Sequence, residues 1–345
     1  MNESPKRSAD ALLSAIRANG VDTIFGLPGG QLNDFFDAMH RAGDGITYVG
    51  SRHEQGAAYM AFGYAKSTGK VGVYTVVPGP GVLNTAAALC SAYANSTPVL
   101  CVTGQIPSSA IGRGVGELHE LPDQLTTLRS LTKWSMRIDH PAQIETVVND
   151  AFREMTTGRP RPVAIETPPD VMAMSAPAGA PNAFRSDAAS VFDEDLVKRA
   201  AAAIAKSKAP LIVVGGGAQH ASEEVRRLAE LIQAPVISFR NGRGVISDDH
   251  PLGCNFIAGY EPWKTADLVI GIGSRMQPYL QEWGVDDDMT LIRVDWDPTE
   301  INRIVKADIG ICGDAKSVAS ALADQCARTI GKRASRNAEI AAAKA

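Results

Sequence analysis

The segment RHEQGAAYMAFGYA, residues 52–65, decides the fold of the first half of the chain. It follows a β-branched segment, Ile46–Gly50, that has the composition of a strand. The segment itself opens a helix so rich in Gly and Ala that another backbone can pack closely against it. Gly72–Val77 is β-branched and apolar again, and it predicts the next strand. Strand, helix and strand in this order indicate an α/β fold.

The same alternation continues in both directions along the chain. Further strands are expected in the first half at Val21–Phe25, Val99–Thr103 and Val163–Glu166. The second half repeats the pattern with strands at Pro210–Val214, Val236–Phe239, Leu268–Ile272 and Leu291–Asp295, and with helices at Leu196–Lys206 and Glu223–Ile232. Mostly apolar strands separated by helices are typical of parallel sheets buried on both faces. We therefore predict two doubly wound parallel-sheet domains.

The domain boundaries follow from changes in composition. The first domain is expected at residues 1–175 and the second at residues 191–330. Between them, residues 176–190 are rich in Ala, Pro, Ser and Gly and have no periodicity, which predicts a linker. Residues 331–345 are basic and rich in Ala, and they read as the start of a connection to a further domain.

Composition excludes several classes of function. The 345 residues carry a formal net charge of -4, so there is no basic surplus to neutralise a nucleic-acid backbone. No run of about 18 apolar residues occurs, so no membrane span is expected. The 5 cysteines are scattered and never in C-x-x-C spacing, which favours buried free thiols over disulfides or a zinc site. We expect a cytoplasmic protein.

Glycine-rich turns follow three of the predicted strands. They are Gly26–Gly30 (GLPGG), Pro78–Asn84 (PGPGVLN) and Val102–Pro107 (VTGQIP). Ligands bind at the carboxyl edge of an open α/β sheet, where such turns lie. Glu54 occupies the first turn of the Gly/Ala-rich helix, a position at which the helix dipole alone favours a carboxylate. Its place among three glycine turns points instead to a functional site.

The order of these motifs is similar to that in thiamine-diphosphate-dependent enzymes of the acetolactate synthase, 2-oxo acid decarboxylase and pyruvate oxidase type. The resemblance covers Ser8 to about Ala327. It implies a pyrimidine-binding domain followed by a central Rossmann-like domain, with Val213–Gly217, Gly271–Arg275 and Val294–Pro298 matching the latter. The implied cofactor is thiamine diphosphate, and the implied substrate is a small 2-oxo acid that is decarboxylated or joined to a second carbonyl compound.

The resemblance also implies roles for individual residues. Glu54 matches the glutamate that hydrogen-bonds N1′ of the aminopyrimidine, where proton sharing leads to the ylide that attacks the substrate carbonyl. The residues that match the loops approaching the pyrimidine are Pro28, Gly29, Gly30, Gly79, Pro80, Gly81 and Asn84.

His119 lies where this chain departs from the acetolactate synthase pattern. Leu118-His119-Glu120 stands in place of a Phe-Gln-Glu segment, and Val77-Pro78 in place of a Thr-Ser pair. An imidazole exchanges protons near neutral pH, so His119 is a candidate proton donor facing the substrate. The alternative is a solvated loop side chain. For His53, next to Glu54, we expect a structural role at the helix start.

The family holds the diphosphate through Mg²⁺ with a G-D-G segment and a later Asn in a C-terminal domain. Gly43-Asp44-Gly45 has no suitable Asn after it, so we interpret it as a turn and expect no metal ligands in this chain. The Mg²⁺ ligands would belong to a C-terminal diphosphate domain beyond residue 345. Because family members bind the cofactor between two chains, the resemblance implies a homodimer or homotetramer that packs through Gln55–Ala65.

Three alternatives remain open. A nucleotide-binding oxidoreductase is suggested by Gly215–Gly217, although the residues after it do not complete G-x-G-x-x-G. FAD is conceivable because Gly273–Arg275 is present, yet Cys254–Tyr260 replaces the family's flavin loop, so FAD is the weaker expectation. The chain could also be a non-catalytic paralogue or a subunit that needs a partner chain.

Overall fold

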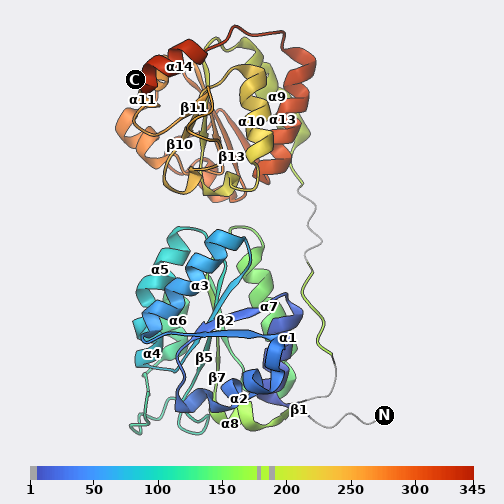
Figure 1. The fold of residues 1–345 in the computed structure, drawn as a ribbon, viewed down its shortest axis with the longest axis vertical. Coiled ribbons are helices and arrows are strands. Elements are labelled where there is room, and N and C mark those ends of the chain that lie inside the picture. The colour runs from blue at the N-terminus through green and yellow to red at the C-terminus, as the bar shows by residue number, and fades with distance from the viewer. Residues whose placement is uncertain (1–5, 177–179, 186–190) are drawn as a thin grey trace. The chain divides into compact units, whose positions relative to one another are not determined.

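The computed structural model describes residues 6–176, 180–185 and 191–345. They form two compact units, Met1–Asp187 and Ala188–Ala345, whose elements are labelled in Figure 1. Part of the predicted linker, at 177–179 and 186–190, lies outside the described residues. In the described part of the linker, residues 180–185, the backbone N–H groups of Asn182 and Phe184 donate hydrogen bonds to the side chains of Glu145 and Asn19. Residues 180–185 therefore pack on the first unit.

The first unit is built on one parallel sheet of six strands in the order β3-β2-β4-β5-β7-β6. The strands are β2 (Thr23–Gly26), β3 (Thr47–Gly50), β4 (Gly72–Val76), β5 (Val99–Gly104), β6 (Trp134–Arg137) and β7 (Val163–Thr167). Gly26 pairs with Gly50 on one side and Thr75 on the other, so the strands end together at one edge. A short antiparallel pair, β1 (Lys6–Arg7) and β8 (Ser175–Ala176), joins the two ends of the unit.

Helices cover both faces of this sheet (Figure 1). One face packs on α1 (Ser8–Ala18), α2 (Asn33–Ala42), α7 (Ile144–Thr156) and α8 (Pro169–Ala173). The other packs on α3 (Glu54–Thr68), α4 (Pro80–Asn84), α5 (Ala86–Ala94) and α6 (Gln124–Leu131). Neighbouring strand residues such as Ile24 and Phe25 therefore belong to opposite core clusters.

The second unit has a parallel sheet of six strands in the order β11-β10-β9-β12-β13-β14. The strands are β9 (Pro210–Val214), β10 (Val236–Ser238), β11 (Gly253–Cys254), β12 (Leu268–Ile272), β13 (Thr290–Asp295) and β14 (Ile309–Cys312). Its helices are α9 (Glu194–Lys206), α10 (Ser222–Ile232), α11 (Tyr260–Trp263), α12 (Pro298–Ile301), α13 (Ala315–Thr329) and α14 (Asn337–Lys344). Counted within the unit, the strand order is 3-2-1-4-5-6, that of a doubly wound Rossmann fold.

The predicted fold class is confirmed, since both sheets are parallel and have apolar clusters on both faces. Strands β9 and β12 have the predicted bounds, and the other predicted strands differ from those observed by one or two residues at an end. Three edge strands of the two six-stranded sheets were not predicted, β6, β11 and β14. In β6 only Ser135 is buried, so the apolar signal of a central strand is absent there.

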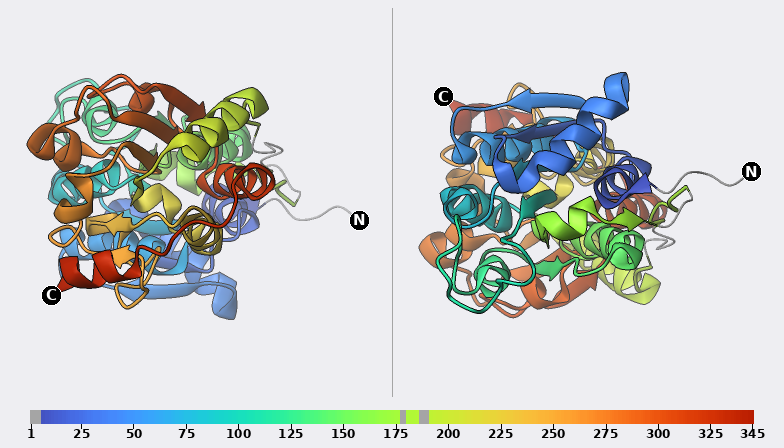
Figure 2. Two further views of the ribbon diagram at one scale, coloured as in Figure 1. Left: turned by 90° about the horizontal axis from the view of Figure 1, so that it is seen from above. Right: turned by 90° about the horizontal axis from the view of Figure 1, so that it is seen from below.

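Residues 331–345 are part of the second unit. Helix α14, red in Figure 2, lies against α11 and β11, and its Ile340 is completely buried. Arg333 and Arg336 donate to backbone carbonyls of α9 and β9, which ties the approach to this helix to the same unit. A connection to a further domain stays a prediction, but it would start from a segment anchored here.

The cysteine prediction needs a correction. All 5 cysteines are free thiols, as expected. Cys101, Cys254 and Cys326 are buried, whereas Cys90 and Cys312 are exposed. Burial had been inferred from composition, and composition does not tell which face of an element a side chain occupies.

Candidate active site

The glycine turns that follow β2, β4 and β5 meet at the carboxyl edge of the first sheet. A Cβ on Gly29 would lie 2.2 Å from Cγ1 of Val77, and one on Gly104 would lie 3.1 Å from Cβ of Gln31. These distances are shorter than van der Waals contact, so the three turns touch and the sequence needs glycine at both points. The edge predicted to bind a ligand is therefore compact and well defined.

Glu54 is the first residue of α3 and is half-buried at this edge. Its Oε2 accepts a hydrogen bond from Nδ2 of Asn84, at 2.9 Å, from the end of α4. Gly81 is the neighbouring residue, since a Cβ there would lie 3.8 Å from Cγ of Glu54. The structure thus brings Glu54 next to two predicted site residues, Gly81 and Asn84, that lie in a later segment of the chain.

His53 acts at the start of the same helix. It is the N-cap of α3, and its Nδ1 accepts a hydrogen bond from the backbone N–H of Gln55 at 3.2 Å. This contact satisfies one of the N–H groups that a helix leaves unpaired at its first turn. The predicted structural role of His53 is confirmed.

His119 lies against the turn that follows β4. A Cβ on Gly79 would come within 2.3 Å of the carbonyl oxygen of His119. Its ring Nδ1 is 2.9 Å from Oε1 of Gln31, whose Nε2 donates to the carbonyl of Leu118 at 3.0 Å. Because Oε1 of Gln31 can only accept, Nδ1 of His119 is the donor in this hydrogen bond.

A buried polar network lies beneath these turns and was not predicted. The amide of Gln124 accepts from Gly79 N–H at 2.7 Å and donates to the carbonyl of Gly104 at 3.0 Å and to Oε2 of Glu166 at 2.8 Å. Glu166 also accepts from Nε2 of Gln105 at 3.3 Å. Burial raises the pKa of the Glu166 carboxyl, and the hydrogen bonds from the two glutamines oppose that rise. The sequence held one signal of this network, because Glu166 ends the otherwise apolar predicted strand Val163–Glu166.

Other predicted site residues have weaker ties to the site. Nothing lies within 4 Å of a Cβ placed on Gly30, and Pro28 and Pro80 are exposed. Their role at the cofactor stays a prediction. Gly43–Gly45 forms a short 3₁₀ turn between α2 and β3, which confirms its interpretation as a turn.

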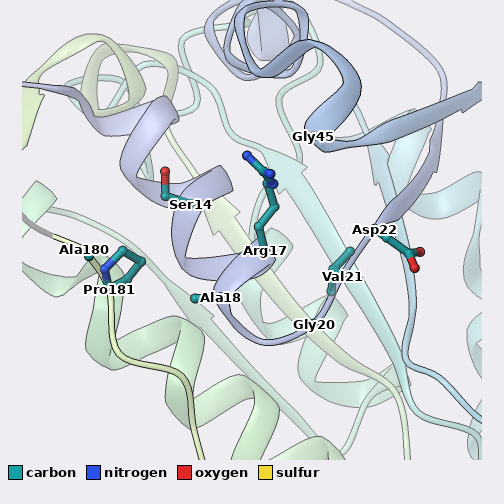
Figure 3. Close-up of a pocket in the computed structure, with 9 residues that line it drawn as sticks. All are labelled: Ser14, Arg17, Ala18, Gly20, Val21, Asp22, Gly45, Ala180 and Pro181. Carbon is teal, nitrogen blue, oxygen red and sulfur yellow. The ribbon is translucent and has the colours of Figure 1, made fainter.

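An open pocket of about 540 Å³ lies elsewhere in the first unit (Figure 3). It is lined by Ser14, Arg17, Ala18, Gly20, Val21, Asp22, Gly45, Ala180 and Pro181. Val21 and Gly45 come just before β2 and β3, so the pocket lies at the amino ends of the strands. It contains none of the predicted site residues and is separate from the candidate active site.

Metal sites and membrane spans are absent from the described part of the chain. Within it, no group of three or more His, Cys, Asp or Glu side chains is placed to hold a metal ion. Within the same ranges, no helix has the length and apolar character needed to cross a membrane.

The fold and site define a two-domain α/β protein with a glycine-lined ligand edge and a carboxylate at a helix start. Residues 6–127 match the family described as "Thiamine pyrophosphate enzyme, N-terminal TPP binding domain". Residues 197–322 match the "Thiamine pyrophosphate enzyme, central domain". The chain belongs to the thiamine-pyrophosphate-dependent enzyme family.

Curated relatives agree with this assignment. A probable acetolactate synthase large subunit of Methanocaldococcus jannaschii is 36% identical over 90% of this chain and 55% of its own length. A probable 2-ketoarginine decarboxylase of Pseudomonas aeruginosa is 35% identical over 91% of the chain and 57% of its own length. A glyoxylate carboligase of Escherichia coli O157:H7 is 31% identical over 92% and 55%. The chain spans about half the length of these relatives.

Proposed function

We propose that this chain forms the pyrimidine-binding half of the active site of a thiamine-diphosphate-dependent enzyme that acts on 2-oxo acids. The observation that carries the proposal is Glu54 at the first turn of α3, hydrogen-bonded to Asn84 and next to Gly81. A helix start favours a carboxylate, and a cofactor ring nitrogen would take the place of Asn84 or share the carboxylate with it.

The residues present fit the cofactor's pyrimidine. Gly29 and Gly81 both pack against the side chain of Val77, which brings the turns after β2 and β4 together, and Gly81 lies beside Glu54. When bound, thiamine diphosphate supplies a nucleophilic carbon for attack on the substrate carbonyl. Glu54 would hold the proton shared with the ring nitrogen, and Asn84 would fix the direction of its carboxylate.

His119 is proposed as the group that faces the substrate. Its Nδ1 is engaged with Gln31, which leaves Nε2 to accept or return a proton during the later steps. The carbonyl of His119 packs on Gly79, so the ring is placed by the turn that also carries Gly81. Leu118, which is 73% exposed, adds an apolar surface beside it.

Several parts of the proposed enzyme lie outside this chain. The diphosphate and its Mg²⁺ would be held by a diphosphate-binding domain, in the same polypeptide or in a partner chain. We further propose a homodimer or homotetramer that packs through α3. Its Tyr59 and the nearby Leu83 of α4 are large apolar residues that remain exposed in the isolated chain.

We assign neither FAD nor a nicotinamide nucleotide to the second unit. A Cβ on Gly273 would lie 2.6 Å from the carbonyl carbon of Gly217, so the backbones of the two turns at its switch point are in contact. The absorption spectrum of the purified protein tests this point, since a bound flavin gives a visible band.

The experiment for the proposed function uses the complete natural protein with thiamine diphosphate and Mg²⁺. A panel of 2-oxo acids is offered, carbon dioxide release is followed, and the products are identified by NMR. Aldehyde products indicate decarboxylation, and hydroxy-ketone products indicate carboligation. A protein that binds no thiamine diphosphate in calorimetry would refute the proposal.

A further inference from the structure

Gln124 is a buried polar residue outside the set that the motifs assign. It is the first residue of α6 and is 2% exposed. Its side chain joins three elements, because it contacts Gly79 after β4, Gly104 at the end of β5 and Glu166 in β7. The turns after β4 and β5 are thereby tied to one side chain.

The three contacts require an amide. Gly79 presents an N–H and needs an acceptor, whereas Gly104 and Glu166 present oxygens and need donors. An amide supplies one acceptor and two donor protons side by side, and no carboxylate or apolar side chain does. An apolar residue at position 124 would leave the Gly79 N–H and the Gly104 carbonyl buried without partners.

Glu166 sets the direction of this amide. Its Oε2 accepts from Nε2 of Gln124 and of Gln105, so both amide oxygens point to backbone N–H groups. For Gln124 that group belongs to Gly79, and for Gln105 it belongs to Ile106, at 2.8 Å. Arg137 lies on the other side of the carboxylate, with Nη1 at 3.5 Å from Oε1.

The turn that Gln124 holds lies between the two proposed catalytic residues. Gly79 has φ +58 and packs on the carbonyl of His119, and Gly81 two residues later lies beside Glu54. We propose that Gln124, oriented by Glu166, is a positioning residue that holds the Pro78–Gly81 turn and, through it, His119. The catalytic consequence of this positioning rests on the proposed function.

The first test measures the turn directly, without cofactor. Hydrogen–deuterium exchange is followed by mass spectrometry in the complete natural protein and its Gln124→Leu variant. We expect peptides containing Gly79 to exchange roughly tenfold faster in the variant, because one buried hydrogen bond is lost. Thr132→Val is the matched control, since it removes a buried side-chain hydrogen bond to Leu128 at the other end of α6. Equal exchange near Gly79 in Gln124→Leu and the control overturns the inference.

A swap of the two side chains tests the role of Glu166. Gln124→Glu alone places two carboxylates against each other and should loosen the turn at least as much as Gln124→Leu. In Gln124→Glu combined with Glu166→Gln, the carboxylate at position 124 accepts both from Gly79 and from the new amide. The double variant should recover slow exchange in part, since the contact to Gly79 is kept while the donor to Gly104 and the acceptor of Gln105 Nε2 are lost. No recovery contradicts an orienting role for Glu166.

The third measurement separates positioning from the proposed function. In Gln124→Leu we expect kcat to fall by roughly 10–100-fold, as for a small misplacement of catalytic groups, with thiamine diphosphate affinity nearly unchanged. A normal kcat together with fast exchange overturns the catalytic part of the inference. If the unmodified protein itself turns over no 2-oxo acid, the proposed function fails, and the exchange data still decide whether Gln124 holds the turn.

Discussion

The two units of this chain share an architecture and differ in what their turns carry. Each has a six-stranded parallel sheet with glycine turns after the central strands. In the first unit the turns bring Glu54, Asn84 and His119 to one edge. In the second unit Gly217 packs directly on Gly273, and a Cβ on Gly242 would strike the carbonyl of Val214 at 2.2 Å. Glycines permit close packing in both units, and in the first unit they lie beside the proposed site residues.

The side chains around the two edges differ as well. The second unit gathers stacked aromatic rings, with Phe256 at 4.4 Å from Phe239 and 4.5 Å from Trp283 between ring centroids. Its buried Arg293 donates to the carbonyls of Ser274 and Glu300, so that charge serves loop anchoring. In the first unit the buried side chains of Gln124 and Glu166 instead form hydrogen bonds beneath the turns after β4 and β5. One architecture can therefore carry the proposed active site in one unit and closely packed turns in the other, depending on a few loop residues.

The largest expected effect compares carboxylates at two helix starts. In the complete natural protein, Glu54→Gln should lower turnover by about 10²–10⁴-fold, the usual value of a positioned acid–base group. Thiamine diphosphate should bind nearly as well, because the shape of the side chain is kept. The matched change Glu194→Gln, at the first residue of α9, should leave turnover unchanged. Exchange of the proton at cofactor C2, followed by NMR, isolates the step, and unaltered exchange in Glu54→Gln would show that the assignment is wrong.

Histidines provide the second comparison. His119→Ala should slow steps after C2 deprotonation by roughly 10–100-fold or change the product ratio, since a proton carrier is lost. C2 exchange should stay normal, which distinguishes this variant from Glu54→Gln. His220 in the second unit contacts Asp314 at 2.6 Å and is the control, because its removal should not alter products. Identical product ratios and rates for His119→Ala and the unmodified protein would contradict a catalytic role.

The third comparison concerns glycines at left-handed positions. Gly79 and Gly273 have φ +58 and φ +56, and in both a Cβ would strike neighbouring backbone. We expect Gly79→Ala and Gly273→Ala each to destabilise its own unit by about 1–3 kcal/mol in thermal or urea unfolding. Only Gly79→Ala should also lower turnover at temperatures where the protein stays folded. A loss of turnover in both variants would remove the distinction between the units.

The smallest effect is a pH dependence of opposite sign in the two units. Burial raises the pKa of Glu166, so its stabilising contribution is present below its unfolded pKa of about 4.3 and is lost as pH rises through the folded pKa. Asp267 in the second unit is also affected by burial, but donors from Ser207 and the following backbone outweigh it and lower its pKa. Its contribution is present above about 3.9 and is lost as pH falls.

The unfolding temperatures of two variants check these signs. Relative to the unmodified protein, Glu166→Gln should become more stable as pH rises from 4 to 7, by about 2–4 °C. Asp267→Asn should be less stable at neutral pH, and the difference should shrink toward pH 3 by a similar amount. The same slope for both variants would contradict the assigned environments.

Local sequence patterns predicted most of the helices and strands, but they did not predict which strands pair with each other. The alternation around Arg52–Ala65 predicts parallel sheets because it reflects burial on both faces. It does not predict that β7 lies between β5 and β6, since strand order depends on contacts between distant segments. The short edge strand β6 was missed because only Ser135 of its four residues is buried, so it has no apolar run.

The candidate site shows the same division. The role of His53 was predicted because a cap depends on a neighbour two residues away. Gln31 as the partner of His119 and Gln124 as the partner of Glu166 were missed, because these pairs are separated by 88 and 42 residues. A glutamate within an apolar strand does signal a buried partner, but not its identity.

The antiparallel pair formed by β1 and β8 has a consequence for how this protein is assembled from parts. Lys6 is paired with Ala176, so the first and last strands of the first unit lie side by side, before residues 180–185 continue along its surface. When the two ends of a unit lie close together, the unit can be inserted into another protein without separating the flanking segments. The same closeness permits circular permutation. The geometry of two short strands therefore favours transfer of the proposed pyrimidine-binding unit between proteins without redesign of its core.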